Sequence, residues 1–263
     1  MRIPIDGRHL AYDHIGEGRP ALLVHAFPLD RRMWAPQGAA LAAVCHCLLP
    51  DVRGFGESDA APPYGVDRYA DDLVALLDTL DIRERVVLGG LSMGSHIAFA
   101  CWRHHRDRVH ALILAGARAG PDSEQTRARR LQIIAAAREQ GTAAVATMLA
   151  GTLVGATTRA RNPQLVTRLH QMIGAASVDG IVGASQAMMA RPDSTPLLAT
   201  IDVPTLIIVG AEDTLAPPSE AEALHAGVRD SRLEVIPGAG HVCSIERPAA
   251  FNQVVTEFLQ DVG

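Results

Sequence analysis

Residues 86–100 read VVLGGLSMGSHIAFA and place Ser92 between two glycines, after a strand-forming run and before a helix-forming run. A serine hydroxyl is a weak nucleophile that needs a nearby base, open access for substrate and donors for the developing oxyanion. A sharp strand-to-helix turn would project the Ser92 hydroxyl and leave the Met93 N–H free. Gly90 and Gly94 would leave room for that turn. The spacing predicts a nucleophilic serine, against the alternative of an ordinary turn.

The base and the acid that would activate Ser92 stand late in the chain, each after a run typical of a strand. They are His241 in PGAGHVCSIERP and Asp213 in IIVGAEDTLAPP. Because parallel strands end at the same edge of a sheet, the loops that follow them can meet there. We therefore expect Asp213 to orient His241, and His241 to take the proton of Ser92. Glu212 is the alternative acid, and we prefer Asp213.

The loop that follows residues 21–25 is expected to supply a second donor for the oxyanion. It reads VHAFPLDRRMW, and its candidate is the Phe27 N–H, paired with the Met93 N–H. His25 also stands at this loop, but it ends a run typical of a buried strand. A structural hydrogen-bonding role is the preferred interpretation for His25.

The elements that must position these residues alternate along the chain. A hairpin is expected at residues 2–18 around Asp6-Gly7, a favoured tight turn. Apolar runs typical of buried strands alternate with segments of helical period, which indicates a parallel sheet with helices on both faces. The expected strands are residues 21–26, 42–51, 85–90, 109–116, 204–210 and 231–238, and the expected helices are 66–80, 93–104 and 248–262.

Nearly ninety residues between Gly116 and Pro204 contain no good strand, and their Ala-rich segments have helical period. A structureless loop of that length is improbable in a compact domain. We expect a helical cap at residues 119–197, inserted into a core domain formed by residues 1–118 and 198–263.

Composition excludes several classes of function. The chain has 263 residues and a formal charge of −5 without a basic stripe, so nucleic acid is not an expected partner. All 24 basic residues are Arg, and the absence of Lys excludes lysine Schiff-base chemistry. The N-terminus lacks an apolar signal core and no apolar run is long enough for a membrane span, which predicts a cytoplasmic protein without a membrane partner. The four cysteines are expected to be free, buried thiols.

The chain resembles the α/β-hydrolase superfamily, and within it the small esterase, 3-oxoadipate enol-lactonase and cofactor-free haloperoxidase-like group. Five motifs in the family's order carry the resemblance: HAFP at 25–28, DVRGFGES at 51–58, GLSMG at 90–94, GAEDTLAPP at 210–218 and GAGH at 238–241. The resemblance implies the α/β-hydrolase fold with a helical cap. It also implies that Asp51 and Arg53 mainly hold loops near the site.

Two positions depart from the family's pattern. The family usually has His-Gly at the loop that supplies the oxyanion donor, whereas this chain has His25-Ala26. The added Cβ puts the placement of the Phe27 amide in question. The family often has Gly-Gly after the Met of the elbow, whereas this chain has Gly94-Ser95, which adds bulk where helix and sheet pack closely.

The residue types select among the family's reactions. Relatives that use an Asp nucleophile are excluded by Ser92, and those that depend on Lys are excluded because the chain has none. We expect a carboxylesterase that hydrolyses small or medium esters through an acyl-enzyme. A lactonase of the enol-lactonase type and a C–C bond hydrolase remain alternatives, and a ligand receptor that turns over slowly is a third class. An Arg in the pocket, with Arg118 and Arg191 as candidates, would favour a lactone that carries negative charge.

The cap is expected to roof an apolar pocket, with Trp34, Met148, Met172, Met188, Met189 and Phe27 as possible lining residues. The expected mechanism requires no metal and no organic cofactor. The adjacent His104 and His105 could suggest a metal site, but they would face different directions on a helix. Cys243 is interpreted as a packing residue. The expected partner is a small ester or lactone, and the chain is expected to be a monomer or a homodimer.

Overall fold

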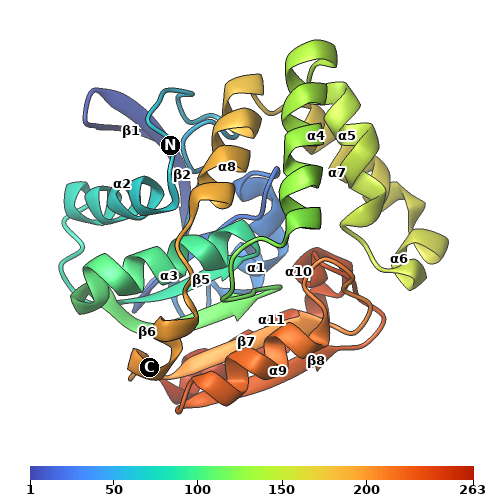
Figure 1. Ribbon diagram of the computed structural model, residues 1–263. Helices are drawn as coiled ribbons and strands as arrows, with labels where there is room; N and C mark the ends of the chain where they lie inside the picture. Colours follow the sequence, from blue (N-terminus) through green and yellow to red (C-terminus); the bar gives the residue numbers. More distant parts are fainter.

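A computed structural model describes residues 1–263 and contains one eight-stranded sheet (Figure 1). Its strand order is β1-β2-β4-β3-β5-β6-β7-β8. The β1–β2 and β2–β4 pairs are antiparallel, and every other pair is parallel. The strands are β1 (Arg2–Ile5), β2 (Arg8–Ile15), β3 (Pro20–Val24), β4 (His46–Pro50), β5 (Val86–Leu91), β6 (Val109–Ala115), β7 (Thr205–Gly210) and β8 (Ser231–Ile236). The mostly parallel sheet confirms the predicted fold class.

The central strands β3, β5 and β7 are buried along their whole length, which explains their continuous apolar runs. Helices cover the sheet: α2 (Val66–Thr79) and α3 (Met93–His105) pack together on one face, and α1 (Ala35–Leu41) packs with α11 (Pro248–Asp261) on the other (Figure 1). Two further core helices, α9 (Pro218–Gly227) and α10 (Cys243–Glu246), follow β7 and β8. Each parallel strand therefore delivers its C-terminal loop to the same edge of the sheet.

The segment between β6 and β7 is helical, as its sequence period predicted. It contains α4 (Glu124–Gln140), α5 (Thr142–Leu149), α6 (Ala156–Arg161), α7 (Pro163–Gly174) and α8 (Val178–Ala190). The α4 helix packs on α8 and α5 packs on α7, and the group lies beyond the strand ends (Figure 1). Buried residues of these helices belong to the same hydrophobic cluster as the sheet. The division of the chain at residues 119 and 197 stays a prediction.

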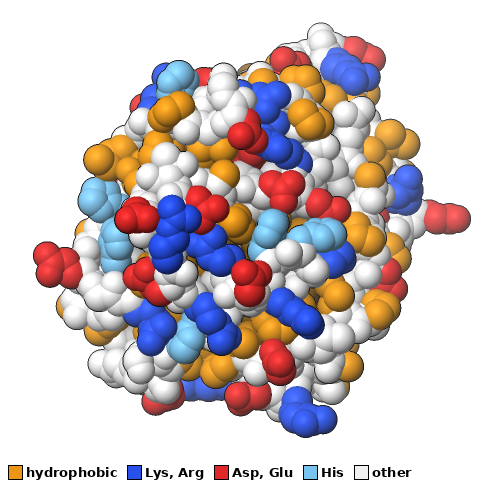
Figure 2. Space-filling view, turned by 90° about the vertical axis from the view of Figure 1, so that its left-hand side faces the viewer, with side chains coloured by type: hydrophobic (Ala, Val, Ile, Leu, Met, Phe, Trp, Pro, Cys, Tyr) orange, Lys and Arg blue, Asp and Glu red, His pale blue; other side chains and the backbone are white.

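Short 3-10 turns complete the chain: η1 (Arg31–Trp34), η2 (Arg106–Arg108), η3 (Ala150–Thr152) and η4 (Thr195–Thr200). No helix has both the length and the apolar composition that crossing a bilayer requires. The face in Figure 2 intersperses acidic, basic and hydrophobic side chains without an extended area of one charge.

The Asp51 and Arg53 side chains hold the loop after β4. The Asp51 carboxylate accepts hydrogen bonds from the backbone N–H groups of Arg31 at 2.7 Å and Glu57 at 2.9 Å. The Arg53 guanidinium donates two hydrogen bonds to the Asp72 carboxylate, at 2.7 and 2.8 Å. Asp51 and Arg53 are both buried, and their contacts agree with the structural role that the resemblance implied.

The four cysteines are free and buried, as predicted. The expected strand at residues 42–51 is shorter, because β4 begins only at His46 and residues 42–44 form a turn after α1. The Sγ atoms of Cys45 and Cys47 lie 3.4 Å apart.

Candidate active site

Ser92 occupies the single-residue corner between β5 and α3. Its φ of 55° is in the left-handed region, which a residue with a side chain rarely adopts, and its N–H donates to the Ala115 carbonyl at 2.8 Å. A Cβ on Gly94 would lie 2.2 Å from the Val24 carbonyl oxygen, and one on Gly90 would lie 2.1 Å from the Gly94 carbonyl carbon. The two glycines are therefore required by close packing. Backbone strain of this kind concentrates at functional sites.

Ser95 lies buried where α3 meets the sheet. Its buried hydroxyl lies 2.8 Å from the Gly90 carbonyl oxygen and 3.1 Å from that of Ala115. The added side chain thus meets hydrogen-bond acceptors at the ends of β5 and β6.

His241 and Asp213 meet at the edge of the sheet. Asp213 follows β7, His241 follows β8, and the Nδ1 of His241 lies 2.7 Å from an Asp213 carboxylate oxygen. The other oxygen of Asp213 accepts the N–H groups of Leu215 at 2.8 Å and Ala216 at 2.9 Å. Both side chains are buried. The backbone bonds hold the carboxylate in place and leave its second oxygen for the imidazole.

Glu212 is engaged elsewhere. Its carboxylate accepts hydrogen bonds from the Thr157 N–H, at 2.8 Å, and from the Thr157 hydroxyl. These bonds lower the pKa of Glu212. Thr157 belongs to α6, so this acid connects the sheet to the cap, and Asp213 rather than Glu212 is the carboxylate beside His241.

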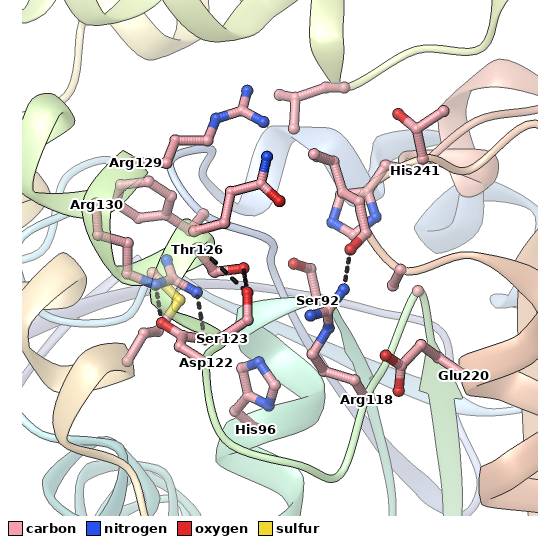
Figure 3. A pocket seen from close by; sticks show the side chains of 18 of the residues that line it. Ser92, His96, Arg118, Asp122, Ser123, Thr126, Arg129, Arg130, Glu220 and His241 are labelled. Atoms are coloured by element: carbon pink, nitrogen blue, oxygen red, sulfur yellow. Dashed lines mark hydrogen bonds and ion pairs between the residues drawn. The ribbon is translucent and has the colours of Figure 1, made fainter.

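Ser92 and His241 line one cavity of about 450 Å³ beneath the cap helices (Figure 3). Gly116 lies against the imidazole, since a Cβ there would be 3.3 Å from two ring atoms. No hydrogen bond joins the Ser92 hydroxyl to the His241 ring in this arrangement. Such contacts are often long before substrate binds.

The loop after β3 presents an unused donor to the cavity. Phe27 lines the cavity, and neither its N–H nor that of Met93 has a partner among the turn, loop and cap hydrogen bonds. Ala26 has no left-handed φ, and its N–H is within 3.2 Å of the Met33 sulfur. The loop therefore holds the extra Cβ of Ala26 without the left-handed conformation that would demand glycine.

His25 is fully buried below this loop. Its Nε2 accepts the Val52 N–H at 3.1 Å, and its Nδ1 lies 3.0 Å from the Ala26 carbonyl oxygen. Burial is the main cause that lowers its pKa. Its contacts are those of the structural residue that the sequence predicted.

Of the residues expected to line a pocket, Met188 lines the cavity, whereas Trp34, Met148 and Met189 do not. Trp34 is buried against Phe251 behind the sheet, with ring centroids 6.0 Å apart. Met148 is 38% exposed on the outside of the cap. Met189 packs, half-buried, against the hydrophobic cluster. Helical period marked these residues as apolar but could not tell which side of each helix faces the cavity.

The cavity is also more polar than predicted, because only seven of its 21 lining residues are hydrophobic. Sequence reasoning missed a charged and polar group comprising His96, Asp122, Gln125, Arg129, Arg130 and Glu220. One signal was available: His96 stands four positions after Ser92, about one turn along the helix that Ser92 precedes.

The two arginine candidates have different positions. Arg118 lines the cavity and donates to the Leu215 carbonyl. Arg191 is buried outside the lining, 2.5 Å from the Asp122 carboxylate and 2.7 Å from the Met188 carbonyl oxygen. Of these two candidates, only Arg118 can contact a molecule in the cavity.

The remaining candidates lie outside the cavity lining. His104 and His105 face separate carboxylates, those of Asp67 at 3.4 Å and Asp71 at 2.8 Å. No group of three or more His, Cys, Asp or Glu side chains is arranged to hold a metal ion. Cys243 is fully buried, and its burial raises the pKa of its thiol.

Comparisons with known proteins agree with this architecture. Residues 20–248 match the family model described as alpha/beta hydrolase fold. A 3-oxoadipate enol-lactonase 2 of Acinetobacter baylyi is 30% identical over 249 residues, which cover 94% of this chain and 91% of the relative. A thermophilic esterase from Thermogutta terrifontis, solved with malate bound, is 38% identical with a TM-score of 0.95, covering 100% and 99% of the two chains. The enol-lactonase of Burkholderia xenovorans LB400 is 30% identical with a TM-score of 0.90, covering 99% and 100%. The chain is therefore a member of the α/β-hydrolase family.

Proposed function

We propose that this α/β hydrolase is a serine carboxylesterase that hydrolyses small to medium esters through a Ser92–His241–Asp213 triad. The observation that carries the proposal is the Asp213–His241 hydrogen bond of 2.7 Å at the wall of a cavity that Ser92 also lines. Relatives named as esterases and enol-lactonases support the hydrolysis of esters or lactones. A cavity of about 450 Å³ suits substrates of this size.

In the proposed reaction, His241 Nε2 takes the Ser92 proton as the hydroxyl attacks the ester carbonyl. Asp213 fixes the ring with Nδ1–H toward its carboxylate, so Nε2 is the basic atom. The Phe27 and Met93 N–H groups stabilise the oxyanion. The alcohol leaves with the proton from His241, and water activated by the same ring then releases the acid and restores Ser92.

A lactone is the second candidate substrate, because Arg118 lines the cavity. Ring opening of a lactone uses the same attack, with the alkoxide remaining part of the product. The named enol-lactonases and the malate-bound esterase among the relatives favour substrates that carry carboxylate or lactone groups.

A direct test compares the wild type with Ser92→Ala on p-nitrophenyl esters of rising chain length and on γ-lactones. We expect hydrolysis of the short esters, and a loss of about 10⁴-fold or more in kcat in the variant, since the nucleophile and its base act as a unit. Ser219→Ala is the matched control, because Ser219 is exposed and lies outside the cavity. Undiminished hydrolysis by the Ser92→Ala protein would refute the proposal.

A further inference from the structure

His96 is a buried polar side chain without a partner. It lies on α3 one turn after Ser92, it is 8% exposed, and it lines the cavity. Neither nitrogen of its ring takes part in a protein hydrogen bond, and both stay accessible at the cavity surface. Figure 3 shows His96 at the wall of the cavity, which Asp122 and Ser123 also line. A molecule in the cavity is the natural partner for this ring.

The surroundings of His96 are positively charged. Burial and the guanidinium groups of Arg191, Arg130 and Arg118 hold its pKa well below 6.5. The ring is therefore neutral and presents one N–H donor and one acceptor nitrogen.

Two of these guanidinium groups share one carboxylate, that of Asp122. Asp122 accepts from Arg130 Nε and from Arg191, each at 2.5 Å. Arg118 has no carboxylate within ion-pair distance, and its guanidinium donates instead to the Leu215 carbonyl. Glu220 also lines the cavity but forms no ion pair with Arg118. A further negative group near Arg118 and His96 would therefore be stabilised.

We propose that His96 and Arg118 form a subsite for a carboxylate on the acyl side of the substrate, which makes monoesters of short dicarboxylic acids the preferred substrates. Ser92 caps α3, and the His96 N–H donates to the Ser92 carbonyl at 3.2 Å, so the two residues stand one helical turn apart, about 5.4 Å along the axis. A separation of that order fits two or three methylene groups between the carbonyl at Ser92 and the carboxylate at His96. The charge-assisted bonds would come from a neutral imidazole N–H and a guanidinium.

This subsite rests on the proposed ester hydrolysis, and matched substrates test it. We expect the wild type to hydrolyse monomethyl glutarate with kcat/KM at least about tenfold above methyl pentanoate, which has the same acyl length and no charge. If methyl pentanoate is the preferred substrate, or if the two esters are hydrolysed equally well, the proposed subsite is wrong. 4-Acetoxybutanoate carries its carboxylate on the alcohol side, and a preference for it would overturn the acyl-side assignment.

Variants of His96 separate recognition from structural damage. His96→Phe is expected to raise KM for monomethyl glutarate about tenfold or more and to change kcat less, so that the preference for the charged ester collapses. His96→Gln keeps an N–H donor and should restore part of that preference. His104→Phe is the control, because His104 lies exposed on the same helix outside the cavity. Equal losses on charged and neutral esters in both His96 variants would contradict the assignment.

Binding without turnover distinguishes failure of the subsite from failure of the proposed function. Calorimetry with Ser92→Ala protein should detect glutarate binding at least about tenfold tighter than pentanoate binding, and His96→Phe in that background should abolish the difference. If the wild type hydrolyses no ester yet this difference is found, the carboxylate subsite stands and the esterase proposal fails. If esters are hydrolysed and glutarate binds no better than pentanoate, the subsite is wrong.

Discussion

The Asp213 carboxylate lies 2.7 Å from His241 Nδ1, although 28 positions separate the two residues in the chain. The loops after β7 and β8 bring them together, and backbone N–H groups hold the remaining oxygen of Asp213. This carboxylate can therefore fix both the orientation and the tautomer of the ring.

Replacing Asp213 tests that relationship against its neighbour. Asp213→Asn should lower kcat/KM for p-nitrophenyl butyrate by about 10³–10⁴-fold, because the amide cannot favour Nδ1–H in the same way. Glu212→Gln should retain most activity, since Glu212 contacts Thr157 in the cap. Circular dichroism of both variants checks folding. Equal losses of kcat/KM in the two variants would show that Asp213 has no specific role in orienting His241.

The packing of the corner at Ser92 gives a stability prediction. Gly94→Ala should destabilise the fold by about 1–3 kcal/mol or prevent folding, because the new Cβ would overlap the Val24 carbonyl. Gly174→Ala is the control at the end of α7, where no atom lies within 4 Å of the position that the new methyl group would take. It should be neutral or raise stability by up to about 1 kcal/mol. The urea midpoints of the two variants measure these stabilities, and equal midpoints would argue against close packing of Gly94 on the Val24 carbonyl.

Breaking the buried Arg53–Asp72 ion pair should lower the free energy of unfolding more than breaking an ion pair at the surface. Both side chains are 4% exposed, and Asp72 also forms an ion pair with Arg68 at 3.0 Å. Asp72→Ala should cost about 3–5 kcal/mol, because it leaves a buried guanidinium without its counter-charge. Arg83→Gln, which removes exposed pairs with Asp78 and Asp81, should change the free energy of unfolding little. A small effect of both substitutions in chemical denaturation would contradict this account.

Buried histidine gives the fold a dependence on pH. Burial lowers the pKa of His25 below its usual value of 6.5, so the unfolded chain binds a proton more readily than the folded one. The free energy of unfolding should therefore fall as the pH drops from 7 through 6.5 toward 5.5. His25→Gln should be less stable at pH 7 but show a smaller change over that range. Parallel slopes of urea midpoint against pH in the two proteins would exclude this contribution.

The order of elements and the catalytic candidates were predictable because both leave local signals. Buried strands such as β5 are apolar throughout, and a glycine on each side of Ser92 marks a tight corner. The helices α1 and α9 were not predicted. Their short sequences APQGAAL and PSEAEALHAG carry weak helical periodicity, and both depend on packing against the rest of the fold.

The cavity wall was predicted poorly for a different reason. Lining is decided by how separate helices rotate against one another, and sequence period does not specify that rotation. Met148 and Met188 both read as apolar cap residues, yet one faces solvent and the other the cavity. Arg118 and Arg191 were both candidates because they stand at the edges of the expected cap, yet only Arg118 of the two lines the cavity, and Arg129 depends on the placement of α4.

The most direct test of the account is covalent labelling of Ser92 by a fluorophosphonate, followed by mass spectrometry of the labelled peptide. We expect stoichiometric modification at Ser92 in the folded wild type, and labelling slowed by at least about 10³-fold when His241 is replaced by Ala, because the hydroxyl then lacks its base. A folded wild-type protein in which Ser92 stays unmodified, or in which removing the His241 ring leaves the labelling rate unchanged, would contradict it.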